Sequence, residues 1–83
     1  MHITIRQLQV FEAVARHLSY TRAAEELHLT QPAVSMQVKQ MESSIGLPMF
    51  EQIGKKIYLT EAGDAMLVHA RTIMRHLEAA SEE

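Results

Sequence analysis

Short polar side chains gather around Gln31 and could make hydrogen bonds to nucleic-acid bases. Thr30, Gln31, Ser35 and Gln37 fall in the first turns of a predicted helix. A glutamine amide can both donate to and accept from adenine, and a hydroxyl suits several base edges in the major groove of DNA. The free N–H groups at a helix start suit a phosphate. The pattern therefore indicates contact with DNA, whereas the competing interpretation is that these residues only cap the helix and face solvent.

A pair of short helices would position these side chains. One helix is predicted over 20–27 and another over 31–44, because Ser19 and Thr30 each precede an apolar repeat that they are suited to cap. Pro32 lies in the first turn of the second helix, where a missing N–H costs nothing. Two helices joined by so short a turn form a helix-turn-helix, whose second helix can enter the major groove.

An opening helix and a small hairpin complete the front of the chain. Apolar residues recur every three or four positions over 5–17, the helical period, and Thr4 with Gln7 forms a capping-box pattern ahead of them. Short apolar stretches at 49–53 and 56–59, with a glycine between them, predict two strands of a hairpin. The predicted fold class is therefore mainly α.

The last predicted helix is too long for the domain it follows. It begins after Thr60, reaches about residue 81 and would measure ~30 Å for ~20 residues. Its apolar positions recur at nearly heptad spacing. Packing on its own domain alone would leave Ile73 and Leu77 bare, whereas antiparallel pairing with a second copy would cover them. The predicted dimer interface is Ala62, Met66, Ala70, Ile73, Leu77 and Ala80.

The net charge of −2 is unusual for a chain that would meet a polyanion, but the charges are unevenly distributed. Residues 1–60 carry six cations and five acids, whereas residues 61–83 carry two cations and five acids. The acidic C-terminal stretch is therefore predicted to face away from DNA, and so are Glu25 and Glu26. Because the front of the chain is only weakly basic, a single copy is expected to bind DNA with modest affinity.

Several function classes find no support in the residues. There is no cysteine for a disulfide or thiolate metal site, and the five histidines show no His-x-x-x-His spacing. We find no nucleophile with a base partner and no phosphate loop, so no enzyme, catalytic residue, metal or cofactor is predicted. No apolar run approaches the length of a membrane span, and no leader opens the chain. A cytoplasmic protein without a membrane partner is expected.

The sequence resembles a known family over about residues 3–80. It is similar to the N-terminal domain of LysR-type transcriptional regulators. The matching segments are Leu8-x-x-Phe11, the run 19–35, Met41-Glu42, Ile45-Gly46, Phe50-Glu51 and the run 59–63. The stretches 12–17 and 31–42 look particularly like regulators of Calvin-cycle (RuBisCO) operons.

The resemblance implies a fold, a partner and an assembly. It implies a winged helix-turn-helix over 1–59, with a three-helix core and the hairpin as the wing, and a linker helix over 60–83 that pairs two protomers. Family members bind double-stranded DNA as homodimers at interrupted inverted repeats in promoters, and full-length members form tetramers. They usually carry a C-terminal domain that binds a small-molecule effector. That domain is absent here, so the chain is expected to be an N-terminal fragment.

The resemblance also implies site residues. Base readers fall at the start of the third helix, and phosphate contacts fall on the second helix, the third helix and the wing. The predicted base-reading residues are Thr30, Gln31, Pro32, Ser35 and Met36, to which the polar pattern adds Gln37. The predicted phosphate contacts are Thr21, Arg22, Lys39, Lys55 and Lys56.

Two positions depart from the common family pattern. Many members have arginine where this chain has Met36 and where it has Gln52. The first change removes a cation able to bind guanine or phosphate, and the second makes the wing less basic. DNA binding is therefore expected to depend less steeply on salt than in a typical member.

The main competing hypothesis is a helical dimerisation or protein-interaction module that does not touch DNA. Such a module would place apolar residues at the start of the third helix, where this chain has polar ones. The polar first turn and the wing lysines Lys55 and Lys56 favour DNA binding.

Overall fold

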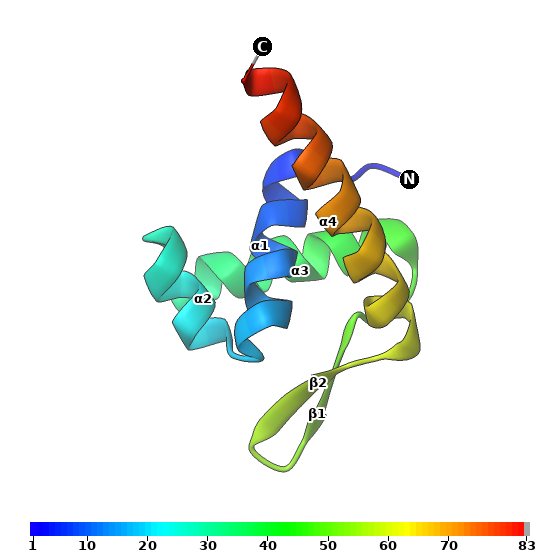
Figure 1. Ribbon diagram of the computed structural model, residues 1–83. Helices are drawn as coiled ribbons and strands as arrows, with labels where there is room; N and C mark the ends of the chain where they lie inside the picture. Colours follow the sequence, from blue (N-terminus) through cyan, green and yellow to red (C-terminus); the bar gives the residue numbers. More distant parts are fainter. Residues whose placement is uncertain (83) are drawn as a thin grey trace.

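Four helices and one antiparallel hairpin make up the chain in a computed structural model that describes residues 1–82 (Figure 1). The elements agree with the predicted helices and strands to within one residue at most ends. The predicted range 60–83 includes Glu83, which lies outside the described residues. In chain order the elements are α1 Ile5–His17, α2 Tyr20–Leu27, α3 Gln31–Ile45, β1 Phe50–Ile53, β2 Lys56–Leu59 and α4 Glu61–Ser81.

Each helix begins at a hydroxyl side chain that accepts a hydrogen bond from a backbone N–H of the first turn, which confirms the predicted caps. In α1 the cap is reciprocal: Gln7 N–H donates to Thr4 Oγ1 at 3.0 Å, and Thr4 N–H donates to Gln7 Oε1 at 3.1 Å. These bonds satisfy N–H groups that have no partner inside the helix. The other three capping residues are Ser19, Thr30 and Thr60.

The turns on either side of α2 are tight because single residues adopt the left-handed backbone conformation. Leu18 has φ 48° and ends α1, and His28 has φ 55° and ends α2. In the second turn, Leu29 N–H donates to the carbonyl of Ala24 at 2.9 Å. The first turn sets the direction of α2 relative to α1 and the second sets that of α3 relative to α2, so together they determine how α3 is presented.

The core consists of two groups of buried side chains. One group joins α1, α2 and α3 around Val10, Val34 and Val38, none of which is more than 1% exposed. The other joins α1 and α3 to α4, and Phe11 lies at its centre with its ring 5.5 Å from that of Phe50. Both groups rest on α1, which therefore supports every other helix.

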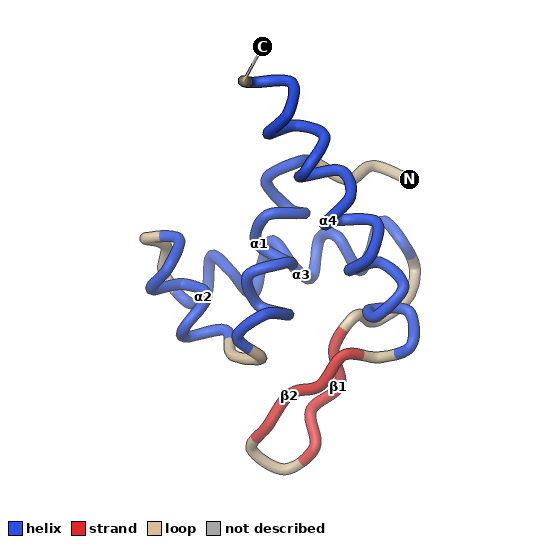
Figure 2. The backbone as a smooth tube through the Cα atoms, viewed as in Figure 1, coloured by secondary structure: helices blue, strands red, loops and turns tan. Residues whose placement is uncertain are grey.

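The hairpin projects from the helices as a wing (Figure 2). Its register pairs Phe50 with Leu59 and Ile53 with Lys56, and Gly54 makes the turn with φ 65°. At the base of the wing, the ring of Tyr20 meets that of Phe50 edge-on at 5.9 Å. The start of α2 and the wing therefore hold each other in place.

Helix α4 has an inner half that packs on its own domain and an outer half that extends past α1 (Figure 1). Ala70 is fully buried against the core, so its place in the predicted dimer interface is corrected: the side chain has no surface left for a second chain. Ala62 and Met66 also pack partly on this core. Ile73 and Leu77 remain 42% and 40% exposed. The members of the predicted interface that remain exposed are therefore Ile73, Leu77 and Ala80, on the outer half of α4.

Candidate nucleic-acid interface

The outward face of α3 carries a shallow hollow that contains most of the predicted base readers. Gln31 and Ser35 lie one turn apart there, and Gln31 Nε2 donates to Ser35 Oγ at 3.3 Å. Met36 is 53% exposed on the same face. The residues that line the hollow are Gln7, Gln31, Pro32, Ser35, Met36, Lys39, Gln40, Ser43 and Ser44.

Two predicted base readers do not line this hollow. Thr30 uses its Oγ1 to accept the Ala33 N–H at 3.2 Å, so its hydroxyl serves as a cap. Gln37 is half-buried, because at 100° per residue it lies beside the buried stripe of Val34, Val38 and Met41. Helical periodicity could have shown this position from the sequence.

Several residues of the same face were missed by the sequence prediction. Gln40 and Ser43 follow Met36 by four and seven residues, so they share its face, and Ser44 lies at the edge. Gln7 comes from α1, and nothing in the local pattern connects it to α3. The hollow consequently extends along nearly the whole of α3, beyond Lys39, which is the last residue of this helix among the predicted DNA contacts.

A second hollow lies between the wing and the starts of α2 and α3. It brings Thr21 and Lys55 together, as two of the predicted phosphate contacts, and places Gln52 beside them. Gln31 lines both hollows, so the two surfaces are continuous. Arg22 and Lys56 are exposed but line neither hollow.

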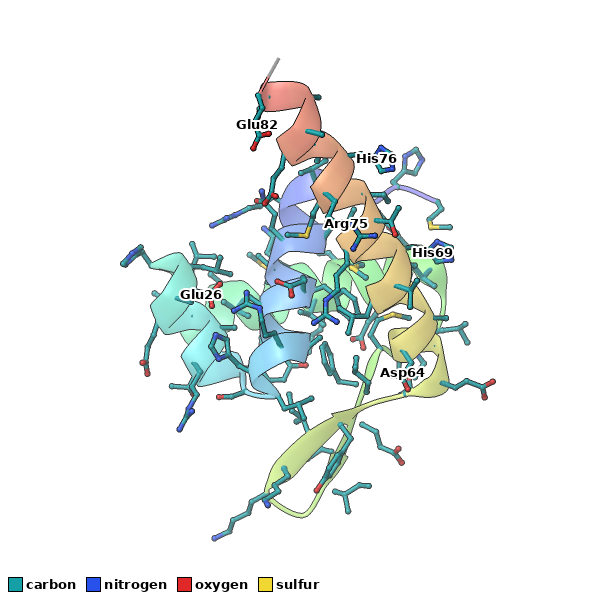
Figure 3. The ribbon with its side chains drawn as sticks, viewed as in Figure 1. Glu26, Asp64, His69, Arg75, His76 and Glu82 are labelled. Atoms are coloured by element: carbon teal, nitrogen blue, oxygen red, sulfur yellow. The ribbon has the colours of Figure 1, made fainter. Side chains whose placement is uncertain are left out.

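Two acids, Glu42 on α3 and Glu26 on α2, are held by neighbouring groups. Glu42 Oε2 accepts the Met49 N–H at 2.7 Å, at the far end of α3. Glu26 binds Arg16 through two hydrogen bonds of 2.6 and 2.8 Å, and its Oε1 lies 2.7 Å from His17 Nε2. Arg16 and His17 are on α1, so Glu26 points from α2 toward α1, as Figure 3 shows. The predicted placement of Glu26 away from the α3 face agrees with this geometry.

These ion pairs connect three helices. Arg16 binds Glu12 as well as Glu26, and Arg71 of α4 lies 3.6 Å from Glu12 Oε2. The hydrogen bonds from Arg16, followed by His17, lower the pKa of Glu26 from 4.5 to about 2. The hydrogen bonds that Arg16 makes to Glu26 and to Glu12 raise the pKa of Arg16. Burial, with a smaller contribution from Glu42, raises the pKa of Tyr20.

Removing the Glu26 charge is expected to flatten the acid side of the stability profile. A carboxylate with a lowered folded pKa stabilises the fold above its unfolded pKa, and this contribution is lost as the pH falls from about 4.5 to about 2. Thermal unfolding of wild type and Glu26→Gln across that window should show the smaller loss of Tm in the variant. Because Glu26 is exposed, the difference should shrink at about 1 M salt, where the screening length is ~3 Å. Parallel profiles would contradict the ion-pair interpretation.

The histidines and the helices were also examined as candidates for a metal site and a membrane span. His69 and His76 project from α4 on the side away from α1 and α2 (Figure 3). Among residues 1–82, no group of three or more His, Asp or Glu side chains is placed to hold a metal ion. Within the same residues, no helix combines the length and the apolar character needed to cross a membrane.

Comparison with known proteins shows the family to which the helix-turn-helix and the wing belong. Residues 5–64 match the family described as "Bacterial regulatory helix-turn-helix protein, lysR family". The chain is a member of the LysR family. Its curated relatives are named as transcription regulators.

The curated relatives include a regulator named for the RuBisCO operon. The RuBisCO operon transcriptional regulator of Allochromatium vinosum is 61% identical over 82 residues, which is 99% of this chain and 27% of that protein. The HTH-type transcriptional regulator CfxR of Cupriavidus necator is 58% identical over 80 residues, 96% of this chain and 25% of that protein. The chain thus spans about a quarter of the length of the relatives it matches.

A solved structure shares the whole architecture. The crystal structure of the CbnR_DBD–DNA complex superimposes with a TM-score of 0.90 at 34% sequence identity, and covers 96% of this chain and 92% of that chain. The predicted winged helix-turn-helix with a long C-terminal helix is confirmed.

Proposed function

We propose that this chain binds double-stranded DNA in a sequence-specific manner, as a homodimer at an interrupted inverted repeat in a promoter. The observation that carries the proposal is the pair of hollows that meet at Gln31, run from the outward face of α3 to the wing and are lined mainly by polar residues. Residues 1–59 form the DNA-binding unit, and the helix from residue 60 onward pairs the two copies. The regulated genes include those of CO2 fixation, an assignment supported by the relatives named for RuBisCO operons.

Within this surface the residues have different roles. Gln31 and Ser35 hydrogen-bond to base edges, and Pro32 contacts a thymine methyl group, because all three line the hollow on the outward face of α3. Thr21 and Lys55 bind phosphate between α2 and the wing, and position the domain without reading sequence. Arg22, Lys39 and Lys56 add charge around these contacts. In the whole protein, which forms a tetramer, a further domain binds a small-molecule effector.

Selection of duplexes from a random-sequence DNA library tests the proposal. The chain should enrich an interrupted inverted repeat, and the enriched duplex should shift in a gel and resist competition by a shuffled sequence. A chain that enriches no sequence, or only single half-sites, would refute sequence-specific binding as a dimer. A stable dimer without DNA binding would favour the protein-interaction module.

Met36→Arg is expected to tighten binding to the enriched duplex by about tenfold. It should also make the slope of log K against log salt concentration more negative by about one for each half-site. The reason is that Met36 is 53% exposed on the α3 face, where a cation would meet phosphate or guanine. Titrations at several salt concentrations measure both effects.

The matched control is Ala79→Arg, which adds the same charge at an exposed position near the end of α4. It should leave the salt slope close to that of the wild type. If Met36→Arg leaves the slope unchanged as well, Met36 does not face DNA.

A further inference from the structure

The side-chain amide of Gln7 is buried, and both its oxygen and its nitrogen have a hydrogen-bond partner. Its side chain is on α1 and only 8% exposed. Its Oε1 accepts the Thr4 N–H at 3.1 Å, as part of the cap of α1. The oxygen of the amide is therefore turned toward the helix start, and its Nε2 must point the other way. On that side lies Gln40 of α3, with its Oε1 3.5 Å from Gln7 Nε2.

This contact determines which end of the Gln40 amide faces solvent. Gln7 Nε2 can only donate, so it attracts the oxygen of Gln40 and not its nitrogen. At 3.5 Å the contact is longer than a strong N–H···O bond, so it orients the side chain and contributes little to stability. Gln40 lines the hollow on the outward face of α3, and its Nε2 is the end left to point outward.

A glutamine held in this way differs from one that is free to turn. A free amide can offer an acceptor or a donor and can adapt to a base edge. Gln40 presents N–H donors only, and within residues 1–82 these donors have no hydrogen-bond partner in the chain. The complementary group on DNA is one that only accepts, and phosphate oxygens are such acceptors on every nucleotide.

We propose that Gln40 donates to a DNA phosphate and that Gln7 is the positioning residue that keeps the Gln40 amide in the donating orientation. The inference rests on the proposed DNA binding and adds a contact about one turn beyond the base-reading residues. It also gives the capping box of α1 a second role, because the same amide that starts the helix also fixes a side chain on the DNA-facing surface.

Duplexes with single neutral phosphates test the inference. The enriched duplex is prepared with one methylphosphonate at a time, and each wild-type phosphate contact appears as a position where affinity falls. One such position in each half-site, with a loss of about tenfold, should belong to Gln40. In Gln40→Ala that position should become insensitive while the others keep their losses.

Gln7→Glu should erase the same position although Gln40 is still present. Glutamate suits a capping box as well as glutamine does, so α1 keeps its cap and the Tm should stay near that of the wild type. Its carboxylate only accepts, however, so it would attract Gln40 Nε2 and turn the oxygen of Gln40 toward the phosphate. Gln9→Glu, the same change two residues along α1, is the control and should keep the wild-type profile.

The outcomes separate the two parts of the inference from each other and from the proposed function. A Gln40→Ala profile identical to that of the wild type overturns the Gln40 contact. A Gln7→Glu profile that still shows the Gln40 position overturns the positioning role, and so does an equal loss of affinity at every position. A wild-type chain that enriches no duplex overturns the proposed function and this inference with it.

Discussion

An Ile73→Glu chain is expected to be monomeric and to bind a paired DNA site about a hundredfold more weakly than the wild-type chain. Ile73 and Leu77 are 42% and 40% exposed on the outer half of α4, and neither belongs to the buried core of the domain. A fully buried side chain of this size contributes roughly 1.5–3 kcal/mol, and two-fold symmetry counts each substitution twice. A buried carboxylate without a partner adds a further cost.

Light scattering and binding to duplexes with one or two half-sites measure the two effects. Leu77→Glu should behave in the same way. Val68→Glu is the control, because Val68 is 66% exposed on the same helix but about 140° around from Ile73. An unchanged mass for Ile73→Glu and Leu77→Glu would remove these residues from the pairing surface.

Gly63→Ala is expected to destabilise the fold by about 1–3 kcal/mol, which lowers the Tm by roughly 5–20 °C in a domain of this size. A Cβ at Gly63 would collide with the backbone carbonyl of Met49 and come within 2.9 Å of Leu59 Cδ2. The same carbonyl accepts the Thr60 N–H at 3.0 Å, so it cannot move freely. In an exposed helix this substitution would instead stabilise by up to ~1 kcal/mol.

Thermal unfolding shows whether Gly63→Ala lowers or raises the stability of the fold. Gly46→Ala is the comparison, because Gly46 has φ 84° and no atom within 4 Å of its would-be Cβ, so only backbone strain acts there. Its loss of Tm should be smaller. A Gly63→Ala chain as stable as the wild type would show that the contact between α4 and the wing can relax.

The elements were predictable because their signals are local. Thr4, Ser19, Thr30 and Thr60 cap helices within three residues of themselves, and the apolar repeats reveal the buried face of each helix. The strand start was less certain: Met49 was predicted in a strand but is buried in the core just before β1.

The features that were harder to predict are contacts between residues that lie far apart in the sequence. Near-heptad spacing in α4 fits both its own core and a second copy, and only the packed structure shows that Ala70 is used by the first. Gln7 and Gln40 are 33 residues apart, and polar residues leave no periodic trace of their partners. The start of the α3 face was predictable from residue types, and helical spacing could have extended it to Gln40 and Ser43, whereas the part that Gln7 contributes from α1 required the packed structure.

The division of α4 into an inner and an outer half has a consequence for how such chains can change length. One uninterrupted helix carries both halves, so a residue inserted between Ala70 and Ile73 would rotate everything beyond it by about 100° and advance it by about 1.5 Å. Substitutions in this stretch alter one side chain each, but an insertion turns the whole outer surface away from its former direction. Three or four inserted residues nearly restore the phase. Viable length variants, and fusions made at this helix, are therefore expected to come in steps of one helical turn.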